Sequence, residues 1–316
     1  MSEKSGIPQP IPQAYPPPVP PPPMVERDNI MRGIAYGLAA YLLFGIMQAC
    51  AKLLMENHNP AEIAFYRNIV AIVPLIIYIA AFKKWHVLKT RKPVALLLRA
   101  VVGTIGLIIT FAAFQYLPMA ETTVILFAGI ILTPAVAYFA LNEHMGWRRW
   151  SAIGIGMVGV ILMVRPSGDV ALIGVLIAFA AACTHAFTNT MLRYLRSENS
   201  LGVTFYFILS GIFIGGLFMP FVGKIPGPDE FLLFLGVGVS AMLAQYLLTS
   251  AFRLAPTSLV AMLNYTGLIW ATIFDVVIWN YVPGLSVFVG GFIILAANLY
   301  IIHRERLAEL RSKRKQ

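Results

Sequence analysis

Long apolar segments alternate with short polar connections along most of the chain. A helix that crosses a bilayer needs about 20 predominantly apolar residues. Ten segments of about this length follow one another, at residues 33–54, 61–82, 94–116, 119–141, 147–164, 171–193, 202–222, 231–252, 257–279 and 285–303. None of them shows the alternation of apolar and polar side chains that marks a transmembrane strand. The pattern therefore predicts an all-α integral membrane protein with ten transmembrane helices.

The composition supports this prediction. Hydrophobic residues make up 59% of the 316 residues and charged residues only 12%, whereas soluble domains average about 45–50% and about 25%. So few polar side chains could not cover the surface of a soluble globule, which excludes one or two soluble domains. The two cysteines, Cys50 and Cys183, form neither a disulfide framework nor a metal-binding pair. We expect no metal and no cofactor.

Lysine and arginine are unevenly distributed between the two sets of connections. If the N-terminus lies in the cytoplasm, 19 of the 24 Lys and Arg residues lie on the cytoplasmic side. Three, Lys52, Arg165 and Lys224, lie on the other side, and the remaining two, Arg67 and Arg99, lie within helices. Cytoplasmic loops of membrane proteins carry such an excess of positive charge. We therefore expect a multi-pass protein of the cell (inner) membrane with both termini in the cytoplasm.

The two halves of the chain resemble each other weakly. At an offset of 138 residues Pro118 matches Pro256, and at about 140 residues Tyr66 matches Tyr206. Each half holds five predicted helices, and because five is odd, the second half must enter the membrane inverted. Inverted repeats are typical of secondary transporters, which bind their substrate near the middle of the membrane between the halves.

This symmetry predicts four parts of the chain. Residues 1–29 form a Pro-rich cytoplasmic tail, 30–166 a first five-helix repeat, 167–303 a second, inverted repeat, and 304–316 a basic cytoplasmic tail. Ten of the 21 prolines lie within residues 1–26. We expect this tail to be disordered, although polyproline of this kind is also a ligand for SH3-like grooves.

Several motifs resemble the EamA family of the drug/metabolite transporter superfamily. They are residues 64–67 (AFYR), 113–118 (AFQYLP), Asn142-Glu143, 159–166 (GVILMVRP) and 265–270 (YTGLIW). The resemblance covers about residues 30–303 and implies ten helices, two inverted repeats and the movement of small metabolites across the cell membrane. In this family an acidic residue commonly follows the fourth and ninth helices. Here it is Glu143 in the first half, but Tyr281 stands at that place in the second.

Polar residues within the predicted helices are the candidates for function, because ionisable side chains in a membrane are costly and face a wet cavity or a partner. The candidates for binding substrate are Gln48, Tyr66, Arg67, Arg99, His185, Asn189, Gln245, Asn264 and Tyr265. The candidates for gating or proton coupling are Lys52, Glu121 and Asp275. An outer gate would pair Glu121 or Asp275 with Lys52 or Arg67. The excess of basic residues among the candidates favours an anionic or zwitterionic substrate.

Some of these residues also have a simpler structural explanation. Glu121 lies in a first helical turn, where the helix dipole stabilises a carboxylate, and Lys52 could extend to the membrane interface. Polar contacts between helices are a further alternative for the whole set. Arg99 is followed on its own face by Gly103 and Gly106, a smooth stripe that predicts the close approach of another helix.

The sequence thus favours a secondary carrier whose partners are a small-molecule substrate and the lipid bilayer. The sequence is compatible with a homodimer, and no nucleic-acid partner is expected. The GxGxxG motif at Gly154–Gly159 lies wholly within an apolar segment, so it predicts close helix packing instead of nucleotide binding.

Two other classes of protein are alternatives to a carrier. The first is an intramembrane enzyme acting on a lipid-linked substrate, for which Glu62 with Arg67 is the nearest approach to an acid/base pair. We expect no enzymatic activity, because this pair lacks a nucleophile. The second is an ion channel. A symmetrical pore is disfavoured because Arg67 aligns with Phe207 in the second half.

Overall fold

The computed structural model describes residues 27–141, 147–163, 169–195, 197–255 and 257–313, and these residues contain helices and no strands. The first half holds α1 (Arg27–Leu54), α2 (Pro60–Ala81), the short 3-10 helix η1 (Trp85–Leu88), α3 (Pro93–Ala113), α4 (Met119–Leu141) and α5 (Trp147–Met163). The second half holds α6 (Asp169–Tyr194), α7 (Ser200–Val222), α8 (Pro228–Leu254), α9 (Thr257–Leu263), α10 (Thr266–Trp279) and α11 (Leu285–Lys313).

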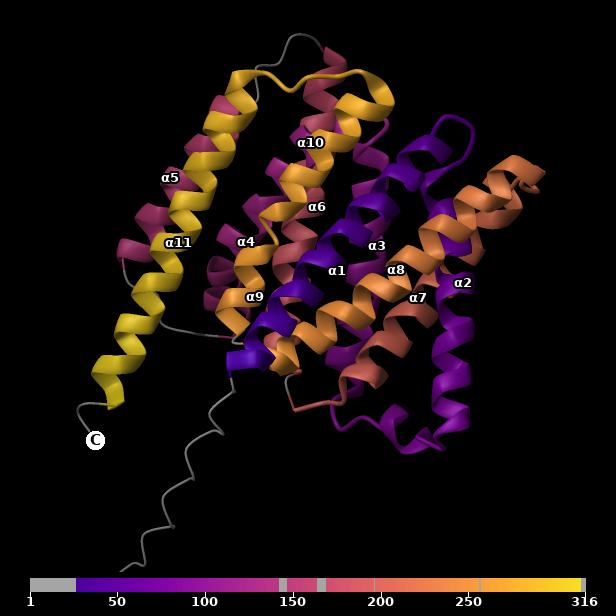
Figure 1. The fold of residues 1–316 in the computed structure, drawn as a ribbon, viewed down its shortest axis with the longest axis horizontal. Helices are drawn as coiled ribbons and strands as arrows, with labels where there is room; N and C mark the ends of the chain where they lie inside the picture. Colours follow the sequence, from indigo (N-terminus) through magenta and orange to yellow (C-terminus); the bar gives the residue numbers. More distant parts are fainter. Residues whose placement is uncertain (1–26, 142–146, 164–168, 196, 256, 314–316) are drawn as a thin grey trace, which may run out of the picture.

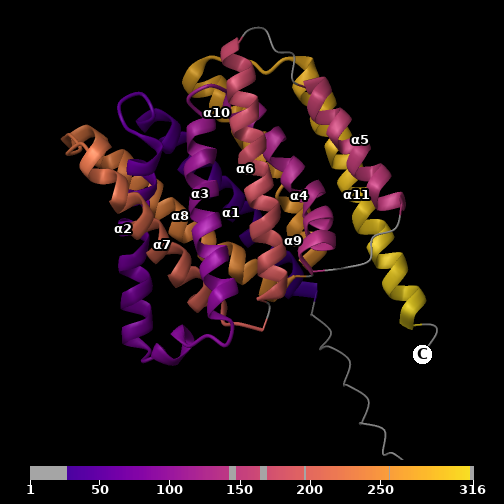
Figure 2. The ribbon, with the colours of Figure 1, turned by 180° about the vertical axis from the view of Figure 1, so that it is seen from behind.

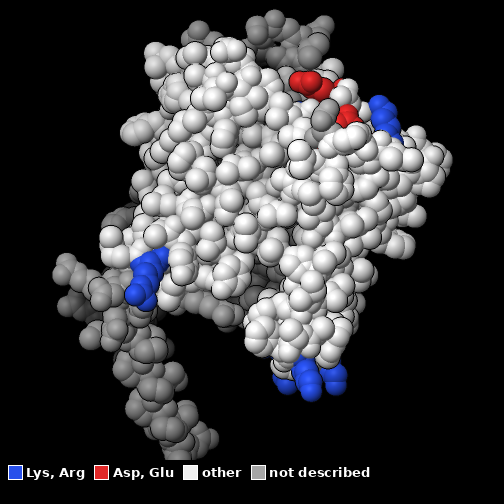
Figure 3. Space-filling model, turned by 45° about the vertical axis from the view of Figure 1, so that its right-hand side comes forward, with Lys and Arg blue, Asp and Glu red and all other residues white. Residues whose placement is uncertain are grey.

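Seven of the described helices are long and apolar enough to cross a membrane, and three shorter apolar stretches accompany them at Trp150–Leu162, Thr266–Trp279 and Leu285–Tyr300. The predicted class is therefore confirmed: the chain is an all-helical, multi-pass membrane protein. Figure 3 shows the same property on one face, where the charged side chains of the described residues gather near the two ends and the broad middle is uncharged. Phe213, Phe221 and Phe292 are among the many large apolar side chains on the surface, as expected of helices that face lipid.

Helix starts follow the proline positions in the sequence. Pro60, Pro93 and Pro228 each stand in the first turn of their helix, where the missing N–H costs nothing and the fixed φ suits a helix. Asn59 caps α2, because its side-chain oxygen accepts a hydrogen bond from the Ala61 N–H at 3.0 Å. Local chemistry thus positions α2, the helix that carries Arg67.

One predicted helix differs in the structure: the apolar segment 257–279 is divided into α9 and α10. At the junction the Tyr265 N–H donates to the Met262 carbonyl at 3.2 Å and the Gly267 N–H to the Asn264 carbonyl at 2.9 Å. These are the tighter, three-residue bonds of a 3-10 turn. Asparagine and glycine are poor helix formers, which favours the change of pitch here.

The helices form one layered bundle (Figures 1 and 2). α5 and α11 pack on each other along one side, and α2 and α7 lie on the opposite side. Between them α1 packs along α8, while α3 and α4 both pack on α6. Val124, Ile125, Ala128 and Ile131 of α4 are fully buried, so this helix lies in the core.

Small residues bring helices close together where the sequence predicts it. A Cβ atom added at Gly156 would lie 2.3 Å from the Ile131 side chain, and one at Gly159 would lie 2.9 Å from Ile293. Close packing is therefore confirmed at these two glycines of the GxGxxG motif, whereas Gly154 has nothing within 4 Å.

Candidate functional site

A cavity of about 300 Å³ lies between α2, α3, α7 and α8. This volume is at the lower end of the range for small-molecule sites. Three of the nine residues predicted to bind substrate line it: Arg67 of α2, Arg99 of α3 and Gln245 of α8. Further polar groups come from Tyr78, Thr204, Tyr246, Thr249 and Ser250.

Arg67 is held in place from its own helix. Its side chain is buried, with 9% of the residue exposed. The Nη1 atom donates to Asn68 Oδ1 at 3.1 Å, and Asn68 Nδ2 in turn donates to the Ala64 carbonyl at 2.6 Å. The Nε atom is buried and has no hydrogen-bond partner within the described part of the chain. The guanidinium group is therefore oriented but only partly satisfied.

Arg99 approaches the same aromatic ring as Arg67. The guanidinium carbon of Arg99 lies 4.7 Å from the centre of the Phe207 ring, and that of Arg67 lies 6.0 Å from it. Such distances allow cation–π attraction. Nε and Nη1 of Arg99 are buried without a hydrogen-bond partner among the described residues. The glycine stripe beside Arg99 explains how α3 fits here, because a Cβ at Gly103 would lie only 3.2 Å from Phe207, which confirms the predicted close approach.

These two arginines form no ion pair with any residue that the structure describes. A largely buried charge without an ion-pair partner is unfavourable, since the hydrogen bond of Arg67 to Asn68 and the contacts with Phe207 replace only part of the lost hydration. A guanidinium group presents up to five N–H donors in a planar fork that matches a carboxylate or a phosphate. The cavity is therefore suited to a small molecule that carries a negatively charged group.

Asp275 of α10 holds together three elements at one end of the bundle, called here the Asp275 end. The residue is fully buried. Its Oδ1 atom accepts hydrogen bonds from the Met119 N–H at 3.0 Å and from Lys52 Nζ at 3.3 Å, and its Oδ2 atom accepts one from the Ala120 N–H at 2.8 Å. The pairing of Asp275 with Lys52, one of those considered from the sequence, is thus present. Lys52 Nζ also lies 4.4 Å from the centre of the Trp279 ring.

Glu121 lies close to Asp275 but has a different partner. The Tyr281 hydroxyl donates a hydrogen bond to Glu121 Oε1. Burial and, after it, this hydrogen bond raise the pKa of Tyr281, so the hydroxyl stays protonated as a donor. Tyr281 occupies the position at which the family commonly has an acidic residue, whereas its counterpart Glu143 lies outside the described residues.

The other predicted binding residues lie away from the arginine cavity. The Tyr66 hydroxyl donates to the Lys224 carbonyl at 3.3 Å, at the Asp275 end. His185 Nε2 lies 3.3 Å from Thr110 Oγ1 between α3 and α6. Asn189 is exposed on α6, Gln48 is half-buried on α1, and Asn264 and Tyr265 form the junction of α9 with α10.

The acid/base pair considered for an enzyme is not formed. Glu62 Oε2 lies 3.1 Å from His58 Nδ1, and Glu62 Oε1 accepts from the Lys224 N–H at 2.9 Å, whereas Arg67 donates to Asn68. Among the described residues, no group of three or more His, Cys, Asp and Glu side chains is arranged to hold a metal ion.

Two important residues were missed at the sequence level. In the sequence, Phe207 stands out only as the residue that aligns with Arg67 between the halves. This alignment is the signal that could have identified it, because the two residues face each other in the cavity. His58 lies in a connection between helices, where neither hydropathy nor depth in the membrane marks it as unusual.

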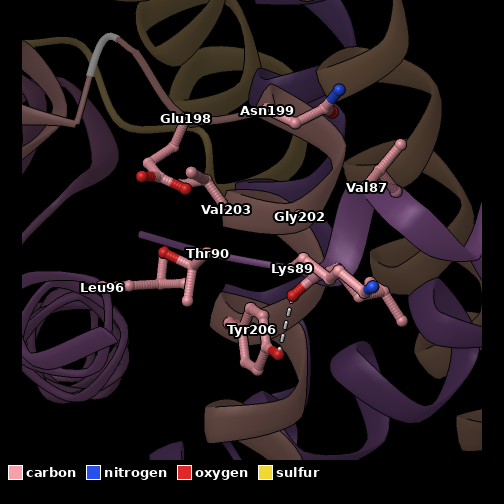
Figure 4. Close-up of a pocket in the computed structure, with 10 residues that line it drawn as sticks. Val87, Lys89, Thr90, Leu96, Glu198, Asn199, Gly202, Val203 and Tyr206 are labelled. Carbon is pink, nitrogen blue, oxygen red and sulfur yellow. Dashed lines mark hydrogen bonds between the residues drawn. The ribbon is translucent and has the colours of Figure 1, made fainter. Parts of the chain in front are cut away.

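A second surface recess lies at the opposite end, where the connection between α2 and α3 meets the start of α7 (Figure 4). The Tyr206 hydroxyl donates to the Leu88 carbonyl at 3.0 Å. A Cβ at Gly202 would lie 2.3 Å from the Val87 carbonyl oxygen, so only glycine permits this approach. The recess is a packed contact between two segments and has no room for a ligand. The end of the bundle at which it lies is called here the Tyr206 end.

The fold and the site define a class: a multi-pass membrane protein with a largely apolar cavity, into which two arginines and a few other polar groups project, between helices from both halves of the chain. The family model of the "EamA-like transporter family" matches this sequence twice, at residues 31–165 and 172–302. The chain therefore belongs to the EamA family, within the drug/metabolite transporter superfamily.

Similar proteins of this superfamily are transporters. An "Uncharacterized transporter" of Helicobacter pylori is 29% identical over 90% of this chain and 99% of its own. An "S-adenosylmethionine uptake transporter" of Rickettsia prowazekii is 26% identical over 87% of this chain and 94% of its own. The "Pseudopaline exporter CntI" of Pseudomonas aeruginosa is 26% identical over 85% and 95%. All three names are those of transporters, and none is that of an enzyme.

A solved structure known only as "Crystal structure of protein" has a similar fold. It superposes with a TM-score of 0.61 at 16% identity and covers 87% of this chain and 98% of that one.

Proposed function

We propose that this protein is a secondary-active transporter that carries small metabolites across the inner membrane by alternating access between two inverted five-helix repeats. The substrate is an amino-acid-like or nucleoside-like metabolite with a carboxylate or a phosphate, bound between Arg67 and Arg99. Both termini lie in the cytoplasm, so that the Asp275 end faces outward.

The packing of the helices supports the proposed repeats. If α9 and α10 count as one broken span, α1 to α5 correspond in order to α6, α7, α8, α9–α10 and α11. The contact of α1 with α8 then corresponds to that of α6 with α3, and the contact of α2 with α8 to that of α7 with α3. The two matches of one family model, to 31–165 and to 172–302, agree with this division.

The observation that carries the proposal is the pair of guanidinium groups near Phe207, which form no ion pair with any described residue. They come from the first half of the chain, whereas Phe207 and Gln245 come from the second. A site built from both halves is the arrangement that alternating access requires. Positive charge in the cavity favours metabolites with an anionic group over cationic drugs.

Two of the similar carriers are named for S-adenosylmethionine and for pseudopaline, so S-adenosylmethionine is the first compound to test. The purified protein would be reconstituted in liposomes, and exchange of labelled S-adenosylmethionine, amino acids and nucleoside phosphates would be measured. We expect exchange of at least one of them. Arg67→Gln or Arg99→Gln should raise its KM about 10- to 100-fold, since a hydrogen bond to a charged group contributes about 1.5–3 kcal/mol.

Arg32→Gln is the matched control, because Arg32 is exposed on α1 and the same charge is removed without touching the cavity. Exchange in both cavity variants with the KM of the native protein would contradict the proposed site. Absence of exchange for every compound, with correctly folded protein, would contradict the proposed function and leave the enzyme as the next hypothesis.

A further inference from the structure

His58 lies between two carboxylates in the connection from α1 to α2, at the Asp275 end. Only 4% of the residue is exposed. Its Nδ1 atom lies 3.1 Å from Glu62 Oε2, and its Nε2 atom lies 3.1 Å from Glu230 Oε2. Glu62 belongs to α2 and Glu230 to α8, so the imidazole ring bridges elements from the two halves of the chain.

This geometry requires one more proton than a neutral imidazole and two ionised carboxylates carry together. A neutral imidazole has a single N–H, and its other nitrogen presents a lone pair. With both carboxylates ionised, that lone pair would lie 3.1 Å from a carboxylate oxygen, which is repulsive. The contacts are attractive on both sides only when both ring nitrogens carry a proton, or when one carboxylate carries it instead.

The other polar groups that the structure describes around the ring do not supply this proton. Lys224, from the connection between α7 and α8, donates through its Nζ atom to the Asn57 carbonyl at 2.7 Å and through its backbone N–H to Glu62. The Tyr66 hydroxyl donates to the Lys224 carbonyl. From α8, the ring of Phe234 packs edge-on against His58 with centroids 5.0 Å apart. Two carboxylates, one ammonium and one imidazolium give a neutral cluster.

We propose that His58, Glu62 and Glu230 form a proton-binding site that holds the Asp275 end closed. The proton is bound as the second N–H of the imidazole. When α8 moves away, Glu230 leaves the ring, and the proton passes to water on that side of the membrane. The proposal rests on the alternating access proposed above, and it assigns the coupling proton to this cluster. Asp275 is left as a structural carboxylate, because its oxygens already accept three hydrogen bonds.

Among the described residues, the Tyr206 end has no counterpart of this cluster. At the offset of about 140 residues that relates the halves, His58 corresponds to Glu198 and Glu62 to Gly202. Glu198 instead accepts hydrogen bonds from the Arg91 backbone N–H. Among the described residues, the histidine that lies between two carboxylates is thus at the Asp275 end, whereas His86 at the other end is exposed.

The distance between the two sides of the cluster tests the proposal without any knowledge of the substrate. Spin labels at Glu56→Cys and Ile225→Cys, both exposed positions beside the cluster, would report it in the full-length protein in lipid nanodiscs, with Cys50 and Cys183 replaced by alanine. We expect a single short distance at about pH 5 and a growing long-distance population toward about pH 9, across the range in which histidine titrates.

His58→Gln should abolish this dependence on pH, because glutamine is polar but does not titrate in this range. His86→Gln is the matched control: His86 lies exposed in η1 at the other end, and its replacement should leave the titration unchanged. A distance distribution that does not change with pH in the native protein, or one that changes equally in His58→Gln, would overturn the proposal.

A transport assay distinguishes a failure of this proposal from a failure of the proposed function. With a compound that the native protein exchanges, His58→Gln should keep exchange at equal pH but lose the accumulation that a pH gradient drives. If the native protein exchanges the compound but a pH gradient drives no accumulation, the proton site is refuted and the transporter stands. If no compound is exchanged, the spin-label titration still decides whether the cluster binds a proton.

Discussion

The contacts of Asp275 allow a prediction that can be worked out in magnitude. Asparagine has nearly the same shape as aspartate but one acceptor oxygen in place of two. In Asp275→Asn the new NH2 group would face either the Ala120 N–H, where Oδ2 now accepts at 2.8 Å, or both the Met119 N–H and Lys52, where Oδ1 accepts at 3.0 and 3.3 Å. At least one donor would be left buried and unsatisfied, and Lys52 would lose the opposite charge. Removing one partner of a buried ion pair costs about 3–5 kcal/mol. Because 14% of the Lys52 side chain is exposed, we expect a loss of unfolding free energy near the lower limit, about 3 kcal/mol.

The free energy of unfolding in mixed detergent micelles would measure this loss. Lys52→Met should be less harmful than Asp275→Asn, because Asp275 keeps its two bonds to the start of α4. In the double variant the losses should not add, and a coupling energy of about 1–3 kcal/mol would report the direct contact. Glu56→Gln is the control, since Glu56 is an exposed carboxylate at the same end and should change stability by about 0.5 kcal/mol or less.

Additive losses, or an Asp275→Asn variant within about 0.5 kcal/mol of the native protein, would refute the reasoning. Either result would mean that Asp275 does not receive three donors in the folded protein.

Two more predictions concern packing and a hydroxyl group. Gly106→Ala should destabilise the protein by about 1–3 kcal/mol, because the new Cβ would lie 2.3 Å from a threonine hydroxyl oxygen of α6. The matched change Gly154→Ala, with nothing within 4 Å, should be neutral or slightly stabilising when unfolding is compared in the same micelles, and equal losses would contradict this. Tyr281→Phe removes the donor to Glu121 and should cost about 1–3 kcal/mol. Since the pKa of Tyr281 is raised, its hydroxyl is protonated at about pH 6 and about pH 9 alike, and the loss should be the same at both; a loss that disappears at the higher pH would count against the contact.

The helices were predictable because the bilayer leaves the backbone few alternatives. An apolar segment in lipid must satisfy its own hydrogen bonds, so hydropathy and proline positions were enough to locate α2, α3 and the others. The junction of α9 with α10 was missed for the same reason: the segment is apolar throughout, and its tighter turn depends on local bonds at Asn264 and Tyr265 that hydropathy does not record.

The candidate site was predictable in its charges but not in its geometry. Arg67 and Arg99 were recognised because a guanidinium group within a membrane is costly. That both approach Phe207 depends on how α2, α3 and α7 pack, which links residues far apart in the sequence. His58 could not be recognised, since its importance comes from the positions of Glu62 and Glu230 around it.

The alignment between the halves bears on why the two ends of the molecule differ. In two inverted repeats, equivalent residues lie at opposite ends when they are far from the symmetry axis and face each other when they are close to it. Tyr66 and Tyr206 fit the first case, because each donates to a carbonyl of the opposite half, at the Asp275 end and at the Tyr206 end. Arg67 and Phe207 fit the second, at 6.0 Å across the cavity. Near the axis, the two halves differ at equivalent positions, so that the guanidinium group of Arg67 lies close to the ring of Phe207. Far from the axis, divergence places His58 between two carboxylates at the Asp275 end and Glu198 against the Arg91 N–H at the Tyr206 end, and on this difference we base the proposal that a pH gradient gives transport a preferred direction.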